Sequence, residues 1–167
     1  MGRQGPFTEG FAETVFGTDK AVKMASEPAR IRADFKHFST IETRWMDNDV
    51  YGHVNNVVYY SYFDTIINRF LISEGGLDIH NGSVIGVCAE SSCRFFEPIA
   101  FPETIFAGLR VKRVGTSSVT YEIGLFRSDS DKAAAHGHFV HVFVDRTSRR
   151  PAPIPQSVRV SFQRLLD

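Results

Sequence analysis

The most regular apolar spacing in the sequence lies between Asn56 and about Ser73. Apolar residues recur there every three or four positions, as they do on one face of an α-helix: Tyr59, Phe63, Ile66 and Phe70. Asn55 precedes this pattern and is a good N-cap residue. The segment is therefore predicted to be a long amphipathic helix that packs its apolar face against other elements.

Alternation of apolar and polar residues, the pattern of half-buried β-strands, surrounds the predicted helix. Before the helix, Ile41, Thr43 and Trp45 alternate with polar residues, which places Trp45 on the apolar face of a strand and favours core packing for it. Four further strand-like runs follow the helix, at 83–96, 104–114, 117–127 and 134–145. Polar and glycine-containing segments between these runs predict hairpin turns.

The ends of the chain have a different character. Residues 1–34 show no sustained period and are predicted to be an N-terminal arm, with a short helix possible over Lys20 to Ser26. At the other end, Pro155 can begin a closing helix, because proline suits the first helical position. Its buried face would contain Val158, Phe162 and Leu165.

This order of elements predicts an α+β domain over residues 35–167. Consecutive hairpin-linked strands form an antiparallel sheet, and its apolar face must be covered. The only long amphipathic helix available is 56–73, so a sheet of about five strands wrapped around that helix is the economical arrangement.

Length and charge narrow the possible functions. The chain of 167 residues is predicted to form one domain, and its 19 Lys+Arg balance its 19 Asp+Glu, which disfavours general nucleic-acid binding. No run approaches the ~18 apolar residues of a membrane span. Cys88 and Cys93 are too far apart to pair along one extended strand. We therefore expect a cytoplasmic protein with reduced cysteines.

A dense polar stretch, residues 44–56, ends at the predicted helix start. It contains the carboxylates of Asp47 and Asp49, and His53. A helix start offers unpaired N–H groups and a positive dipole end, which can bind an oxyanion. A nearby carboxylate could then act as a base or nucleophile on an acyl carbon. From the spacing alone, a capped loop with Asx turns is favoured over the catalytic interpretation.

The residues of this stretch resemble a known family signature. Asp49-Val50-Tyr51-Gly52-His53-Val54-Asn55-Asn56, followed by an aromatic helix, is similar to the motif of the 4-hydroxybenzoyl-CoA thioesterase-like family of hotdog-fold acyl-CoA thioesterases. It also resembles the corresponding stretch of plant acyl-carrier-protein thioesterases. The resemblance extends from about Phe38 to Asp145, and it implies the hotdog fold.

The resemblance also implies roles for single residues. Asp49 matches the catalytic carboxylate, and the backbone N–H of Asn56 matches the group that polarises the thioester carbonyl. His53 and Asn55 match supporting residues of the site. Whether Asp49 attacks the carbon or activates water stays open. Asp47 occupies a commonly acidic position for which a structural role is favoured.

Substrate-binding candidates lie elsewhere in the chain. Tyr59 is one, and Glu90 is another, although Glu90 could simply pair with Arg94 two residues away. Coenzyme A requires cations and N–H donors for its phosphates. The turn after the third predicted strand could supply them through Lys112, Arg113, Ser117 and Ser118. Solvated charges at an exposed hairpin are the alternative.

No cofactor is expected. Along a strand, His136 and His138 share one face while His141 points to the other, so a third ligand is missing and a metal site is not predicted. The predicted function is hydrolysis of an acyl-CoA or acyl-carrier thioester by a homodimer or homotetramer. A non-catalytic acyl-CoA-binding module and a hydroxyacyl-thioester dehydratase are the alternatives.

Overall fold

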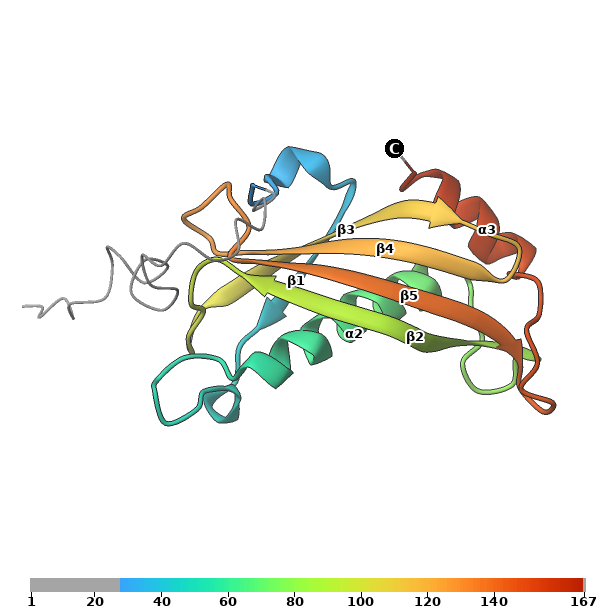
Figure 1. Ribbon diagram of the computed structural model, residues 1–167, viewed down its shortest axis with the longest axis horizontal. Coiled ribbons are helices and arrows are strands. Elements are labelled where there is room, and N and C mark those ends of the chain that lie inside the picture. The colour runs from blue at the N-terminus through green and yellow to red at the C-terminus, as the bar shows by residue number, and fades with distance from the viewer. Residues whose placement is uncertain (1–27, 167) are drawn as a thin grey trace, which may run out of the picture.

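A computed structural model describes residues 28–166 of the chain (Figure 1). The predicted helix over Lys20 to Ser26 lies outside this range. The elements in chain order are η1 (Arg32–Asp34), β1 (His37–Glu42), η2 (Trp45–Asp47), α2 (Asn56–Ser73), β2 (Val84–Phe95), β3 (Thr104–Val114), β4 (Ser118–Phe126), β5 (Ala135–Asp145) and α3 (Gln156–Gln163).

The strands form one antiparallel sheet of five strands in the order β1-β3-β4-β5-β2. Helix α2 lies along one face of this sheet (Figure 1). The α+β hotdog architecture predicted from the sequence is therefore confirmed. Strands β1 and β2 form the two edges of the sheet. They are the strands immediately before and after α2 in the chain.

Helix α2 begins and ends where the sequence predicts. The Asn55 side chain accepts a hydrogen bond from Val57 N, as an N-cap does. The predicted apolar face is buried against the sheet. At the C-terminal end, Gly76 adopts a positive φ of 63°, a conformation that favours glycine. The chain can therefore leave the helix and turn towards β2.

The closing helix α3 covers the end of the sheet farthest from the start of α2. Pro155 is its N-cap residue, and Phe162 is fully buried. The Phe162 ring lies 6.3 Å from Phe70 of α2 and 5.7 Å from Tyr121 of β4. The predicted buried face of this helix is therefore confirmed, and it completes the core at that end.

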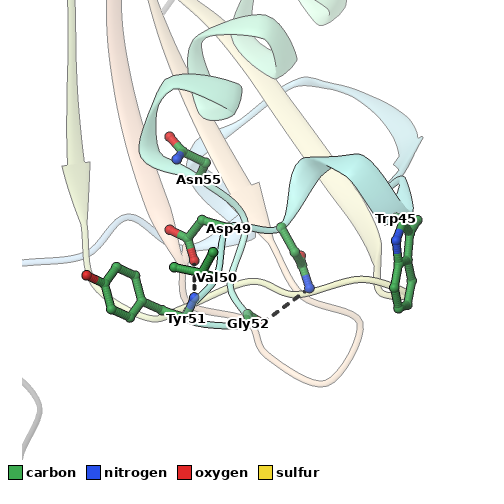
Figure 2. Close-up of a pocket in the computed structure, with 7 residues that line it drawn as sticks. Trp45, Asp49, Val50, Tyr51, Gly52 and Asn55 are labelled. Carbon is green, nitrogen blue, oxygen red and sulfur yellow. Dashed lines mark hydrogen bonds between the residues drawn. The ribbon is translucent and has the colours of Figure 1, made fainter.

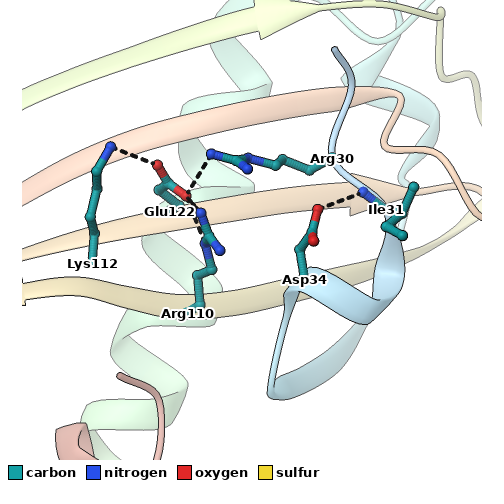
Figure 3. Close-up of polar contacts among 6 residues, drawn as sticks. All are labelled: Arg30, Ile31, Asp34, Arg110, Lys112 and Glu122. Carbon is teal, nitrogen blue, oxygen red and sulfur yellow. Dashed lines mark hydrogen bonds and ion pairs between the residues drawn. The ribbon is translucent and has the colours of Figure 1, made fainter. Parts of the chain in front are cut away.

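The end of the predicted N-terminal arm and the first residue of the predicted domain, Phe35, pack on the other face of the sheet. Phe35 lies over Gly108 and Gly124, where an added Cβ would approach its ring to 2.8 Å. The guanidinium of Arg30 lies 3.6 Å from Glu122, a carboxylate that also pairs with Arg110 and Lys112 (Figure 3). Burial opposes ionisation of Glu122, but the hydrogen bonds from Arg110 and Lys112 outweigh it and lower its pKa.

The two sheet edges differ. The Arg69 side chain donates to Ser39 Oγ at 3.1 Å and to the Thr40 carbonyl at 2.8 Å, so α2 covers part of the β1 edge. Strand β2 is mostly exposed along its central residues. Within residues 28–166, no helix is both long and apolar enough to cross a membrane.

Candidate active site

Asp47 anchors the loop that leads from β1 to α2. Its side chain is only 1% exposed. Its carboxylate accepts hydrogen bonds from Arg44 N at 2.8 Å and from the Tyr62 hydroxyl at 2.7 Å. Burial opposes ionisation, but these hydrogen bonds and the Arg44 guanidinium hold the pKa of Asp47 below its usual value. These contacts favour a structural role for Asp47.

The prediction that Trp45 packs in the core is wrong. Strand β1 ends at Glu42, and Trp45 begins the short helix η2, where it is 82% exposed. The hydrogen bonds of Asp47 to Arg44 turn the backbone here, since Asp47 N also donates to the Arg44 carbonyl at 2.9 Å. The alternation that begins at Ile41 therefore does not continue as a strand.

Backbone hydrogen bonds close the loop tightly after Asp47. Asp49 N donates to the His53 carbonyl at 2.9 Å, and Gly52 N donates to the Asp49 carbonyl at 3.0 Å. Gly52 has a φ of 84°, which a residue with a side chain rarely adopts. Asn55 N donates to the Asp47 carbonyl at 2.8 Å, which brings the loop back to the start of α2.

The half-buried Asp49 is presented by this loop towards solvent. Its Oδ1 accepts a hydrogen bond from Tyr51 N at 2.9 Å, an Asx turn (Figure 2). Within residues 28–166, no other hydrogen bond reaches this carboxylate. The second oxygen therefore has the capacity to accept a proton or approach an electrophile.

The first turn of α2 lies next to Asp49. Val57 N is capped by the Asn55 side chain at 3.1 Å, and Val58 N donates to the Asn55 carbonyl. Among the described residues, none accepts a hydrogen bond from Asn56 N. That N–H is available to a ligand oxygen at the positive end of the helix dipole.

A depression of about 650 Å³ contains both Asp49 and the N-cap residue of α2 (Figure 2). Its lining residues are Trp45, Asn48, Asp49, Val50, Tyr51, Gly52 and Asn55. The structure therefore brings together Asp49, Asn55 and the start of α2. The predicted residue His53 belongs to the same loop, but it is exposed and does not line the depression.

Tyr59 lies in the core and does not line the depression. It is 3% exposed, and its ring contacts Phe95 of β2 at 4.9 Å. Burial raises the pKa of Tyr59 to about 12. In a single chain, Tyr59 therefore packs the first turns of α2 against β2.

Glu90 lies on the sheet face that points away from α2. Its cross-strand partner is Val140, and its carboxylate lies 3.5 Å from His138 Nε2. His138 of β5 is thus the partner that the structure shows for Glu90, where the sequence suggested Arg94. Within one chain, the sheet separates Glu90 from the Asp49 loop.

The predicted coenzyme A residues lie at the far end of the sheet. Thr104, at the start of β3, pairs with Glu42 near the Asp49 loop, whereas β3 ends at Val114. Its 11 residues span about 33 Å at the usual strand rise. Within one chain, the residues predicted to bind coenzyme A therefore lie far from Asp49: Lys112, Arg113, Ser117 and Ser118.

The histidines of β5 alternate as predicted. His136 pairs with Arg94 and His138 with Ser92, on the sheet face away from α2. His141 is 3% exposed on the opposite, helix-covered face. In the part of the chain that the structure describes, no group of three or more His, Cys, Asp or Glu side chains could hold a metal ion.

Sequence reasoning missed the network that fixes the loop. Arg44, Asp47 and Tyr62 join the end of β1 to the middle of α2. Arg44 N donates to the Asp47 side chain three residues later, but arginine is not a capping residue, so the spacing alone does not indicate this turn. The contact of Asp47 with Tyr62 is a tertiary one, and no spacing rule indicates it.

Comparisons with known proteins give the family and the fold. A family model described as the Thioesterase-like superfamily matches residues 43–162. The crystal structure of PA5185 from Pseudomonas aeruginosa PAO1 is 54% identical, covers 84% of this chain and 98% of its own, and superposes with a TM-score of 0.82. PA2801 of Pseudomonas aeruginosa, a putative thioesterase, is 30% identical with a TM-score of 0.71, covering 76% and 98% of the two chains.

Two further relatives extend the comparison. A thioesterase from Thermus thermophilus, solved with coenzyme A and zinc, is 28% identical with a TM-score of 0.66, and covers 79% of this chain and 95% of its own. The uncharacterized protein YsmA of Bacillus subtilis is 24% identical over 89 residues, which are 53% of this chain and 60% of YsmA. The matched family segment contains the Asp49 loop, α2 and all strands except β1, and on this evidence the chain belongs to the thioesterase-like superfamily.

Proposed function

We propose that this protein hydrolyses acyl-CoA thioesters to a free acid and coenzyme A. The observation that supports this function is a depression lined by both Asp49 and Asn55, the residue before Asn56, whose N–H donates to no described residue. A thioester carbonyl needs such a donor, and hydrolysis needs a base or nucleophile next to it.

In the reaction, the carbonyl oxygen accepts a hydrogen bond from Asn56 N. The positive end of the α2 dipole stabilises the negative charge that develops on this oxygen. Asp49 takes a proton from water, and the hydroxide adds to the carbonyl carbon. The intermediate then collapses, the carbon–sulfur bond breaks, and the thiolate of coenzyme A takes up the proton.

Direct attack by Asp49 is the second route. The carboxylate oxygen then bonds to the carbonyl carbon, the thiolate leaves, and water hydrolyses the resulting mixed anhydride. The exposed position of the loop leaves room for water in either case. Hydrolysis in labelled water under single-turnover conditions identifies direct attack when label enters Asp49, because only water that attacks the Asp49 carboxyl carbon of the anhydride places the label there.

In this proposal, a second copy of the chain contributes residues that bind the phosphates of the substrate. Antiparallel pairing of two β2 edges would place the partner's Val84 end beside Phe95, the site end of this strand. The 115–118 turn lies at the Val84 end of the sheet, since Ser118 pairs with Val142 close to the partners of Val84. The partner's turn would then face this site and could supply cations for the phosphates.

Coenzyme A is the proposed carrier of the acyl group. The related thioesterase from Thermus thermophilus was solved with coenzyme A, which supports this choice. The motif from Asp49 to Asn56 resembles that of 4-hydroxybenzoyl-CoA thioesterases, so aromatic acyl groups belong in the substrate panel beside aliphatic ones.

Thiol release from a panel of acyl-CoA thioesters tests the proposed function. We expect Asp49→Asn to keep the fold and to lower kcat by at least ~100-fold, because a positioned base or nucleophile is lost. Asp129→Asn is the matched control, since Asp129 is an exposed carboxylate in the loop after β4, away from the depression. Unchanged hydrolysis by folded Asp49→Asn protein would contradict the proposal.

A further inference from the structure

Trp45 is the single tryptophan of the chain, and water surrounds most of its side chain. It lines the same depression as Asp49 (Figure 2). Large aromatic side chains are usually well buried in folded proteins. An exposed indole at the rim of the candidate active site therefore indicates a surface that a bound group completes.

The indole is held in place. Its backbone begins η2, which the buried Asp47 carboxylate fixes through Arg44 N. Its ring contacts Phe101 edge-to-face, with centroids 5.8 Å apart and an interplanar angle of 82°. Phe101 N in turn donates to the Asn48 side chain, which also lines the depression. A ring held by these contacts loses little freedom when a ligand stacks on it.

We propose that Trp45 stacks on the adenine base of coenzyme A. This inference rests on the proposed function, and it assigns the nucleotide end of the substrate to the rim beside η2. Aromatic side chains are the usual stacking surface for nucleobases, because every base presents a π-face. The volume of about 650 Å³ lies in the range of small-molecule sites.

This assignment separates coenzyme A from an acyl carrier protein. Both carry the acyl group on a phosphopantetheine arm, but only coenzyme A has an adenine base. Stacking on Trp45 would therefore contribute binding energy to the coenzyme A thioester alone. A second copy of the chain covering Trp45 is the competing occupant of this surface.

The single tryptophan makes the test direct. Titration with free coenzyme A should quench the tryptophan fluorescence saturably, whereas 4′-phosphopantetheine, which lacks the base, should not. The emission before titration should be that of a water-exposed indole. Blue-shifted emission that coenzyme A does not change would show that another surface covers Trp45, which would overturn the proposal.

Variants give an independent measurement by calorimetry. Trp45→Leu should bind coenzyme A about 5- to 150-fold more weakly, the effect expected for loss of one stacked base. Trp45→Tyr should keep most of the affinity. Met46→Ala is the control, because Met46 is exposed in the same turn but does not line the depression, and its affinity should match the wild type.

Failure of this inference differs from failure of the proposed function. Equal affinity of Trp45→Leu and wild-type protein for coenzyme A, or no binding of coenzyme A, overturns the stacking assignment. Thiol release from acyl-pantetheine thioesters, which lack adenine, continues to report whether the protein is a thioesterase.

Discussion

At the scale of single residues, Asp47 and Asp49 show how environment separates two identical side chains. They lie two positions apart. The Asp47 carboxylate is buried and accepts hydrogen bonds from Arg44 and Tyr62. Among the described residues, the Asp49 carboxylate accepts one hydrogen bond, and Asp49 lines the depression. Removing the Asp47 carboxylate would disturb the turn that positions Trp45. Removing the Asp49 carboxylate should affect chemistry alone.

His141 is the residue whose charge should control stability in mild acid. Burial lowers its pKa to about 4, and Asp64 on α2 only partly opposes this. The unfolded chain binds a proton at His141 below about pH 6.5, whereas the folded chain does not until about pH 4. The free energy of unfolding should therefore decrease from pH 6.5 to pH 4, by up to about 3 kcal/mol.

Urea denaturation at several pH values checks this prediction. His141→Gln should have a smaller decrease in unfolding free energy over the same pH range, whatever its stability at pH 7. His80→Gln, a change at an exposed histidine in the loop before β2, should retain the wild-type dependence. Equal pH dependence in all three proteins would show that His141 is not the responsible group.

At the scale of elements, α2 packs tightly on the sheet where Gly137 of β5 faces Phe63. An added Cβ at Gly137 would come within 2.7 Å of the Phe63 ring. Gly137→Ala should lower the free energy of unfolding by about 1–3 kcal/mol, because the core has no room for the methyl group. Chemical denaturation measures the change.

A double-mutant cycle tests the cause. In a Phe63→Leu background, the smaller side chain leaves space, so Gly137→Ala should be less destabilising than in the wild type. If the two changes are additive, the loss of stability does not come from this contact.

The sequence predicts elements well where periodicity is long. Helix 56–73 and strand 104–114 have the predicted bounds. In the helix, buried residues recur on one face over three or more helical turns, and in the strand, buried and less buried residues alternate over three or more repeats. The prediction for Trp45 is wrong because the alternation of Ile41, Thr43 and Trp45 is compatible with either a strand or a chain that enters a turn. The hydrogen bond from Tyr62 to Asp47 stabilises the turn, and the sequence does not reveal this tertiary contact. The motif predicts Asp49 and Asn56 as site residues, and these roles stay predictions. Spacing along the chain could not show that the 115–118 turn lies at the opposite end of the sheet.

At the scale of the whole molecule, the β2 edge, which no other strand of residues 28–166 pairs with, predicts a dimer. Its central residues are mostly exposed, and Val50, Tyr51 and Phe95 add exposed apolar surface at the site end. Exposed edges and apolar surface of this kind favour association. Light scattering at micromolar concentration should show a mass at least twice that of one chain.

Ser91→Lys should shift this assembly towards monomer, because an antiparallel pair brings the same region of both β2 strands together and like charges repel. Activity should fall with it if the partner completes the site. Thr40→Lys on the β1 edge is the control and should keep the wild-type mass. A wild-type protein that is fully active as a monomer would contradict the shared site.

The Arg69 contacts at the β1 edge have a consequence for solubility. A sheet with two open edges can add copies at both and grow into a ribbon or fibre. Here the guanidinium donates to the Thr40 carbonyl, a backbone group to which an incoming strand would bond, and its contact with the Ser39 hydroxyl holds it beside that carbonyl. If two copies join through β2, as proposed, each would use its more open edge, and growth of the sheet would stop at two chains. We therefore expect loss of the Arg69 side chain to open the β1 edge and to increase the tendency of the protein to form fibrous aggregates.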